Sequence, residues 1–307
     1  MGHSFTRTFL MAAALLLIPV SLIPEDYYTP LNQLTALASG QVLRLLAGGE
    51  TVAVRGTHIA LGGFRVQVIA ECSTVHLMAL YSAFVYAFPS AWREKSIGLG
   101  AGGLLLFGVN MLRIALVTLI GRYFPDRFEA AHIYLGQLGM LVAMVALCLG
   151  WCRWAAAGGR LDGPAGFVAR FLLISGPLFL LWVPLNRYYM GALDGSLQWF
   201  FGLAGIRLVI PKTHHLYYQT FSLSALVALL LAAREVVLSR RLRRIGGGLV
   251  LCTLFQAAVR LCNVGLSAFG LHWLAPVAQV VYQLCIHGLP LAVALGFLMR
   301  RRLPNTA

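Results

Sequence analysis

The chain has 307 residues, of which 59% are hydrophobic and only 11% are charged. Soluble domains carry roughly 25% charged residues, so this composition excludes an ordinary soluble globular protein. The formal net charge is +14, but the basic residues stand mostly in short segments between apolar runs, which indicates membrane topology and excludes nucleic acid as the partner.

Apolar runs of about 20 residues are long enough to cross a bilayer as helices. The first run follows Arg7 and resembles a signal peptide, but it has no clear small-x-small cleavage site and ends in Pro24-Glu25-Asp26. We therefore interpret it as a retained span. The predicted fold class is an all-α polytopic transmembrane bundle of about eight spans, at 8–24, 72–91, 97–121, 132–152, 167–185, 219–234, 246–268 and 274–299.

The segment between the first two spans, residues 25–71, is the longest one outside the predicted helices. Residues 31–47 space their apolar side chains as an amphipathic helix that lies on the membrane surface does. Residues 51–69 alternate apolar and polar residues and contain Arg-Gly and Gly-Gly turn signals. This pattern predicts a small β-hairpin that leads directly to Glu71 and Cys72.

The basic residues predict which side of the membrane each segment occupies. Those between the spans fall on one side, which the positive-inside rule makes cytoplasmic, with both chain ends inside. They are Arg7, Arg93, Lys95, Arg153, Arg160, Arg234, Arg240, Arg241, Arg243, Arg244, Arg300, Arg301 and Arg302. The segments 25–71, 122–131, 186–218 and 269–273 are then extracytoplasmic, and we expect a multi-pass protein of the inner or cytoplasmic membrane.

The chain reads as two similar halves, residues 1–155 and 167–307, joined by a Gly-rich linker at 156–166. Arg113 and Arg260 stand 147 residues apart, as do His132 and Gln279. Near the position of Cys72 the second half has Thr220 and Phe221, so no thiol or imidazole is matched there. We expect four spans in each half, arranged as a parallel repeat whose second copy is degenerate.

Three residues of the first half have the side chains of a nucleophilic site. Cys72 opens the second span and His132 opens the fourth, both at the extracytoplasmic side, and Arg113 lies inside the third. A thiol needs a base or a positive field to become a thiolate, and imidazole is able to take its proton. A guanidinium stabilises the oxyanion that forms when a carbonyl is attacked.

The order of these residues resembles the exosortase/archaeosortase family of membrane-embedded cysteine transpeptidases, over about residues 5–152. The shared features are Cys72 in an E-C-S element, Asn110-x-x-Arg113 in the next span and His132 at the start of the following one. The resemblance implies that Cys72 is the nucleophile, with Arg113 and His132 completing the site. It also implies a substrate that is a secreted protein with a C-terminal sorting signal, composed of a short motif, a transmembrane helix and a basic tail.

One departure from the family pattern follows the Cys-Ser pair, where many relatives have glycine and this chain has Thr74 and Val75. Further candidates for substrate binding or support of the site are Glu71, Asn110, His76, Arg55 and Arg65. His76 is an alternative base, and the two arginines are candidates for binding a substrate carbonyl or a lipid phosphate. No metal and no organic cofactor is implied.

A second function class remains open on the sequence alone. Two parallel four-helix repeats with intramembrane arginines, Arg113 and Arg260, are also typical of a transporter or flippase. Geometry discriminates between the two. Convergence of Cys72, Arg113 and His132 at one face favours the enzyme, whereas a polar cavity between the halves favours the transporter.

Overall fold

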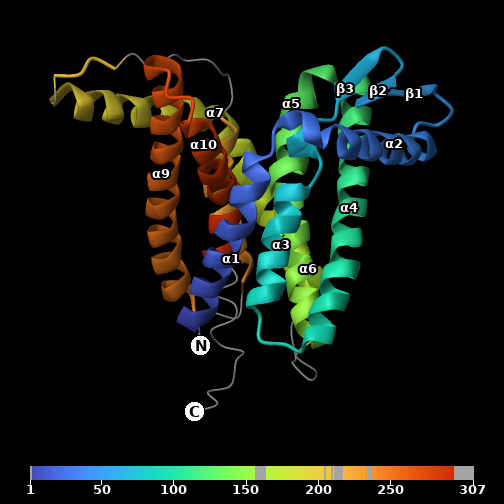
Figure 1. Ribbon diagram of the computed structural model, residues 1–307, viewed down its shortest axis with the longest axis horizontal. Helices are drawn as coiled ribbons and strands as arrows, with labels where there is room; N and C mark the ends of the chain where they lie inside the picture. The colour runs from blue at the N-terminus through green and yellow to red at the C-terminus, as the bar shows by residue number, and fades with distance from the viewer. Residues whose placement is uncertain are drawn as a thin grey trace. The chain divides into compact units, whose positions relative to one another are not determined.

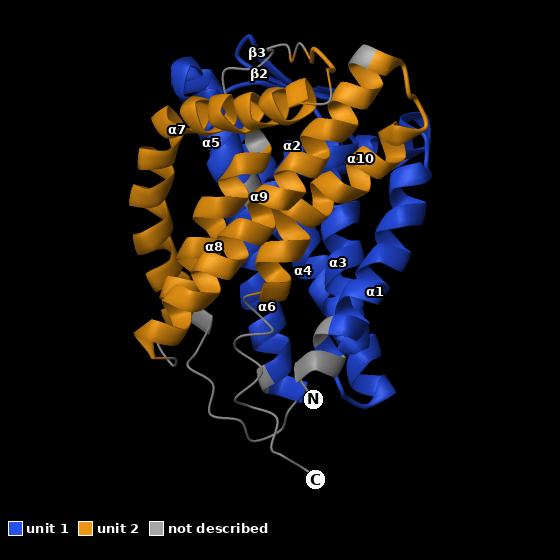
Figure 2. Cartoon of the chain, turned by 90° about the vertical axis from the view of Figure 1, so that its left-hand side faces the viewer, with its two compact units in different colours: residues 1–164 blue, residues 165–307 orange. Residues whose placement is uncertain are grey.

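The computed structural model describes residues 2–155, 164–203, 205–208, 210, 217–233 and 237–293. The chain divides into two compact units, residues 1–164 and 165–307 (Figure 2). Most of the predicted linker (156–163), the arginines at 160, 234 and 300–302, and the end of the last predicted span (294–299) lie outside the described residues.

Unit 1 contains six α-helices and one small β-sheet in its described part. The helices are α1 (Gly2–Leu22), α2 (Thr29–Leu46), α3 (Val75–Ala87), α4 (Trp92–Tyr123), α5 (Phe128–Ile133) and α6 (Met140–Ala155). A π-helical stretch, Tyr134–Gly139, joins α5 to α6. Figure 1 shows α2 and the strands at one end of this unit and the start of α1 at the opposite end.

The helix predicted at 31–47 is present as α2, and it leaves the direction of α1 at an angle of 101°. Its inner face is buried and contains small side chains such as Ala36, Ser39 and Gly40. On its outer face Leu34 and Leu37 are more than half exposed. A helix that runs across the spanning helices and has an apolar outer face is typical of the membrane interface.

The β structure predicted at 51–69 is present, but the sheet has three strands where a hairpin of two was expected. The strands are β1 (Val52–Arg55), β2 (His58–Leu61) and β3 (Phe64–Gln67), paired antiparallel in the order β1-β2-β3. Gly56, Gly62 and Gly63 have positive φ and make two tight turns, each of two residues, where one was expected. Such turns match the twist of a hairpin and favour glycine.

One face of the sheet is packed against α2 and α4. Ile59, opposite both Val54 and Val66, is fully buried in a cluster that also contains Leu43 of α2 and Ile114 of α4. Phe64 of β3 packs edge-on against Phe128, with ring centroids 5.1 Å apart. The Phe64 ring also lies against Gly121, near the end of α4, where a Cβ atom would collide with it. The sheet is therefore fixed to α2 and α4, and so is the start of the segment that leads from β3 to Cys72.

The prediction of an all-α membrane bundle is confirmed, but the count of eight spans is not. In the described residues five helices are long and apolar enough to cross a membrane, or six if the bent pair of α1 and α2 counts as one span. The helices at the second and sixth predicted spans, α3 and α8 (Phe221–Ala232), have only 13 and 12 residues. At 1.5 Å per residue each covers about 20 Å, less than the roughly 30 Å hydrocarbon core.

The regular secondary structure in the described part of unit 2 is helical. Besides α8 it contains α7 (Pro164–Leu203), α9 (Leu238–Phe269), α10 (Leu274–Gln283) and a π-helical stretch at Leu284–Gly288. Residues 186–203, which follow the fifth predicted span, continue α7 as a helix. Gly191 and the Asp194-Gly195 pair favour a turn here, but no proline after Pro184 interrupts the backbone hydrogen bonds of the helix.

Candidate active site

Cys72 lies in a short 3₁₀ turn (Ala70–Cys72) between the sheet and α3, and only 9% of its surface is exposed. Its backbone N–H donates to the carbonyl of Ile69 at 2.8 Å. The next residue, Ser73, donates its hydroxyl to the carbonyl of Ala70 at 2.6 Å. These bonds fix the thiol just before the first turn of α3, the end of a helix that favours negative charge.

Thr74 has a φ of 63°, which makes it the one non-glycine residue with positive φ in the described chain. A β-branched residue in this left-handed region carries strain of order 1–3 kcal/mol. Thr74 directly follows the Cys-Ser pair and has the backbone conformation that glycine adopts most easily. The threonine is buried, and its hydroxyl donates to the Ser73 carbonyl at 2.5 Å.

Two residues of α4 reach the Cys72 segment. The side-chain amide of Asn110, fully buried, donates to the Cys72 carbonyl at 2.6 Å and accepts a bond from Arg113 Nη1 at 3.1 Å. The Nη2 of Arg113 lies 3.8 Å from Cys72 Sγ. Arg113 Nε is buried and has no hydrogen-bond partner among the described residues. One donor edge of the guanidinium is therefore unused.

His132 stands in α5, directly before the π-helical stretch, a feature that is frequent at functional sites. Its ring stacks on Phe128 one turn earlier, with centroids 5.8 Å apart. Phe128 in turn contacts Phe64 of β3. The imidazole is thus held by an aromatic chain that begins in the sheet.

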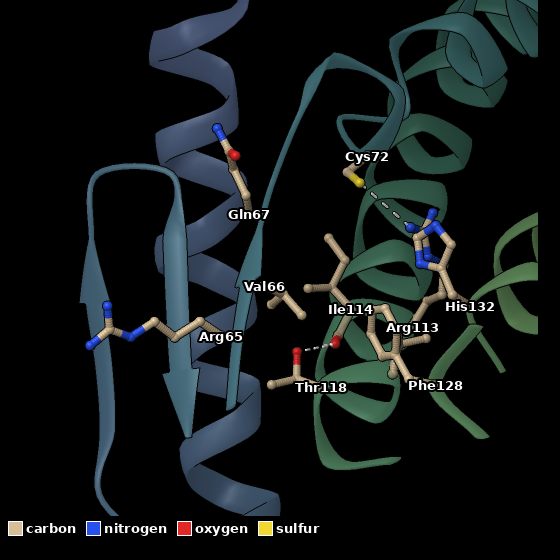
Figure 3. Close-up of a pocket in the computed structure, with 10 residues that line it drawn as sticks. Arg65, Val66, Gln67, Cys72, Arg113, Ile114, Thr118, Phe128 and His132 are labelled. Atoms are coloured by element: carbon tan, nitrogen blue, oxygen red, sulfur yellow. Dashed lines mark hydrogen bonds between the residues drawn. The ribbon is translucent and has the colours of Figure 1, made fainter. Parts of the chain in front are cut away.

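Cys72, Arg113 and His132 line one pocket of about 200 Å³ (Figure 3). Its complete lining is Arg65, Val66, Gln67, Cys72, Arg113, Ile114, Val117, Thr118, Phe128 and His132. The three predicted residues come from three separate segments, so their convergence follows from the fold and not from local sequence. The pocket combines a thiol, an imidazole and a guanidinium with a mostly apolar wall, an arrangement suited to nucleophilic attack on a carbonyl.

The other predicted site residues lie in different places. Arg65 lines the pocket, and Asn110 contacts Cys72 behind it. Arg55 is exposed at the end of β1, and Glu71 is exposed beside the thiol; neither lines the pocket. His76 is buried in α3 outside the lining, and its Nε2 has no partner among the described residues.

Six residues that line the pocket were not predicted from sequence: Val66, Gln67, Ile114, Val117, Thr118 and Phe128. Phe128 had a usable sign, since it precedes His132 by four residues and shares its helix face. Val66 and Gln67 had none, because their place in the pocket depends on the third strand, which was not predicted.

Unit 2 contains a buried arginine, Arg260, whose surroundings differ from those of Arg113. Arg260 Nε and Nη2 donate to the two carboxylate oxygens of Asp194 at 2.7 and 2.8 Å, and both side chains are more than 90% buried. The guanidinium also stacks over Tyr217 at 5.5 Å. Gln219 and Gln256 lie close by, joined by a bond of 3.1 Å from the Gln256 amide to the Gln219 carbonyl.

The fold and this pocket define a multi-pass membrane protein with a cysteine, an arginine and a histidine gathered at one end of unit 1. Residues 1–149 match the family model of the transmembrane exosortases. No curated protein and no solved structure matches the chain.

Proposed function

We propose that the protein is a membrane-embedded cysteine transpeptidase or protease that cleaves a C-terminal sorting signal. The observation that carries the proposal is the 3.8 Å approach of Arg113 Nη2 to Cys72 Sγ in a pocket that His132 also lines. The match of residues 1–149 to the exosortase family model supports it.

The reaction has two halves. His132 takes the thiol proton of Cys72, and the thiolate attacks a peptide carbonyl to give a tetrahedral oxyanion beside Arg113. His132 returns the proton to the leaving amine, the C–N bond breaks and a thioester remains on Cys72. An acceptor amine or water then attacks the thioester, and the thiol is restored.

The site faces the extracytoplasmic side in this proposal. Figure 1 shows the sheet and α2 at the end of unit 1 opposite the start of α1. Arg7 lies near the start of α1, and Arg93 and Lys95 lie in the first turn of α4, which the positive-inside rule assigns to the cytoplasm. In intact cells an impermeant maleimide should label Thr51→Cys and spare Ala91→Cys, both made in a Cys72→Ala background, and the reverse pattern contradicts the orientation.

The expected substrate is a secreted protein whose tail consists of a short motif, a transmembrane helix and a basic end. A tail that spans the membrane brings its motif to the same level as a thiol at the end of a helix bundle. Membrane lipid surrounds both partners, and the positive-inside rule holds the basic tail in the cytoplasm.

Unit 2 is proposed to be a non-catalytic copy of the same fold. Hydrogen bonds of the Cys72 segment recur 147 residues later, where Thr220 donates its hydroxyl to the Tyr217 carbonyl at 2.8 Å as Ser73 does to Ala70. The Gln256 amide reaches the Gln219 carbonyl as Asn110 reaches that of Cys72.

In this correspondence Gln219 stands at the position of Cys72, one residue before Thr220, the position inferred from sequence. Gln279 stands at the position of His132. Arg260 keeps the place of Arg113, but its Nε and Nη2 are used by Asp194. A guanidinium bound in this bidentate way has those donors occupied and cannot offer them to an oxyanion. The copy therefore serves the first unit as scaffold or support.

The experiment that tests the function is the capture of the acyl-enzyme. In His132→Ala the thioester should form slowly and also resolve slowly, because the same residue serves both halves of the reaction. Mass spectrometry of proteolytic fragments should then find a substrate peptide joined to Cys72, and its last residue gives the cleavage point. Recovery of processed substrate with no adduct on Cys72 in this variant, even after rapid acid quenching, contradicts the covalent mechanism.

A further inference from the structure

Strand β3 is an open edge of the sheet, since in the order β1-β2-β3 it pairs only with β2. Leu61 and Phe64 close the second turn, and the Val68 N–H donates to the Thr57 carbonyl at 2.8 Å. In an antiparallel pair, hydrogen-bonded positions alternate along the strand. Residues 64, 66 and 68 therefore bond to β2, and the backbone N–H and C=O groups of Arg65 and Gln67 point away from it.

The Cys72 pocket runs along this edge. Three consecutive residues, Arg65, Val66 and Gln67, line it, although successive side chains of a strand point to opposite faces. Figure 3 shows the Arg65 side chain directed across the sheet, away from Cys72, while Val66 is directed toward Ile114. What the strand presents to the pocket is therefore its backbone edge.

We infer that the substrate binds as a fourth strand on β3. This rests on the proposed function and specifies how the peptide is held. The segment that precedes the scissile bond lies extended along the pocket and exchanges main-chain hydrogen bonds with Arg65 and Gln67. An unpaired strand edge is a ready template for an extended peptide, and added strands gain affinity from the main chain.

The two backbone positions are about 7 Å apart along the strand, which fixes the peptide at two points upstream of the bond to be cut. β3 leads through the 3₁₀ turn directly to Cys72, so a peptide aligned on β3 is carried toward the sulfur. Main-chain pairing is indifferent to most side chains. Selectivity then comes from the apolar pocket wall formed by Val66, Ile114 and Phe128.

The first test removes one edge donor without altering the ladder. Gln67→Pro loses an N–H that points away from β2, and proline is tolerated at such edge positions. Gln67→Ala loses the side chain and keeps the N–H, so it is the matched control. Conversion of a tail-anchored host substrate should fall about tenfold or more in the proline variant, as expected when a backbone group of the bound peptide is left unpaired. The proline variant is compared with the alanine variant, so that loss of the Gln67 side chain is common to both and the difference reports the N–H alone.

The second test does not depend on folding of a variant or on knowledge of the sorting motif. The full chain is alkylated at Cys72 either with acetyl-Ala-Ala-Ala-chloromethyl ketone or with iodoacetamide, and hydrogen exchange is measured for single amides. With the peptide ketone the Arg65 and Gln67 amides should exchange about tenfold or more slowly, because they become hydrogen-bonded. The Val66 amide is already bonded to β2 and should not change, and iodoacetamide should protect none of the three.

Failure of this inference is distinguishable from failure of the enzyme function. If the peptide adduct forms but Arg65 and Gln67 exchange as in the iodoacetamide sample, or if Gln67→Pro converts substrate as well as Gln67→Ala, strand addition is wrong while the cysteine mechanism stands. Normal conversion of substrate by Cys72→Ala instead removes the function on which the inference rests.

Discussion

The guanidinium of Arg113 lies 3.8 Å from the sulfur of Cys72, although 41 residues separate them in the chain. Asn110 fixes this relationship because it bonds to both residues, at 2.6 Å to the Cys72 carbonyl and at 3.1 Å to Arg113. The arginine therefore has one donor at the sulfur and an unpaired Nε beside it. In unit 2 the corresponding donors of Arg260 are occupied by Asp194. We therefore expect Arg113 to act in the reaction and Arg260 to act in folding.

Replacement of Arg113 by lysine should abolish most of the activity. Lysine keeps the charge but loses the planar fork that reaches Asn110 and the sulfur at the same time. Loss of one oxyanion donor typically costs roughly 10² to 10³ in rate. Conversion of a tail-anchored substrate per amount of folded enzyme is the measurement. A lysine variant that converts substrate within about twofold of the parent chain would show that the fork has no part in the reaction.

The buried Asp194–Arg260 pair should matter for folding and not for chemistry. Arg260→Met and Asp194→Leu should each lower the thermal midpoint and the abundance, because removal of one partner leaves an uncompensated buried charge at a cost of about 3–5 kcal/mol. The double variant should recover much of that loss, since replacement of a buried pair by apolar residues is often neutral.

The double variant also provides the control for catalysis. Its conversion of substrate per folded enzyme should equal that of the parent chain. A well-folded double variant that binds substrate but no longer cleaves it, as we expect for Arg113→Met, would show that the second unit takes part in the reaction.

The strain at Thr74 predicts an unusual order of stability. Thr74→Gly and Thr74→Ala both lose the side chain beyond Cβ, but only alanine keeps the Cβ that is disfavoured at φ 63°. The left-handed region costs about 1–2 kcal/mol for a residue with a Cβ, so the glycine variant should be more stable than the alanine variant by about 1 kcal/mol. Thermal unfolding in one detergent measures the difference, and a more stable alanine variant would contradict the strain.

The strength of the contact that Glu50 makes with the end of α4 should depend on pH. Glu50, in the segment before β1, accepts hydrogen bonds from the Tyr123 hydroxyl at 2.5 Å and from Arg122 Nε at 3.1 Å. These bonds, that of Tyr123 first, hold the pKa of the Glu50 carboxyl below its usual value. A lowered pKa stabilises the folded state above the unfolded value, and this contribution is lost as the pH falls through the folded value.

Below about pH 4, protonation of Glu50 should therefore loosen the sheet, and its amides should exchange faster relative to their intrinsic rates. In Glu50→Gln, which has no charge to lose, protection of the same amides should be lower near neutral pH and flat across the acid range. If the glutamine variant keeps the acid dependence of the parent chain, another group is responsible.

The sequence alone predicted the helical membrane bundle because long apolar runs leave no other way to satisfy the backbone in a bilayer. It also named Cys72, Arg113 and His132, since residues at the same ends of adjacent spans are brought together by any bundle. It overestimated the number of long spans, because an apolar run of 20 residues around α3 includes a 3₁₀ turn and a strained residue, Thr74, before the helix starts at Val75.

The rest of the site depends on tertiary structure that local patterns do not carry. Two consecutive tight turns make three strands of only four residues each, too short for alternation to distinguish them from one longer hairpin. The role of β3 as a pocket wall follows from that third strand. Arg55 and Arg65 looked equivalent in sequence, yet only Arg65 lies in the strand beside the thiol.

The most direct test of the central claim is the reaction of the enzyme–substrate mixture with hydroxylamine, which cleaves a thioester and leaves a hydroxamate on the released peptide. The parent chain with a tail-anchored substrate should yield the cleaved protein with a C-terminal hydroxamate. Cys72→Ala should yield none, and Cys72→Ser should yield almost none, because serine is a much poorer nucleophile without strong base activation. Cleaved substrate at parental levels from a folded Cys72→Ala variant would contradict the account and leave the two-repeat transporter as the better interpretation.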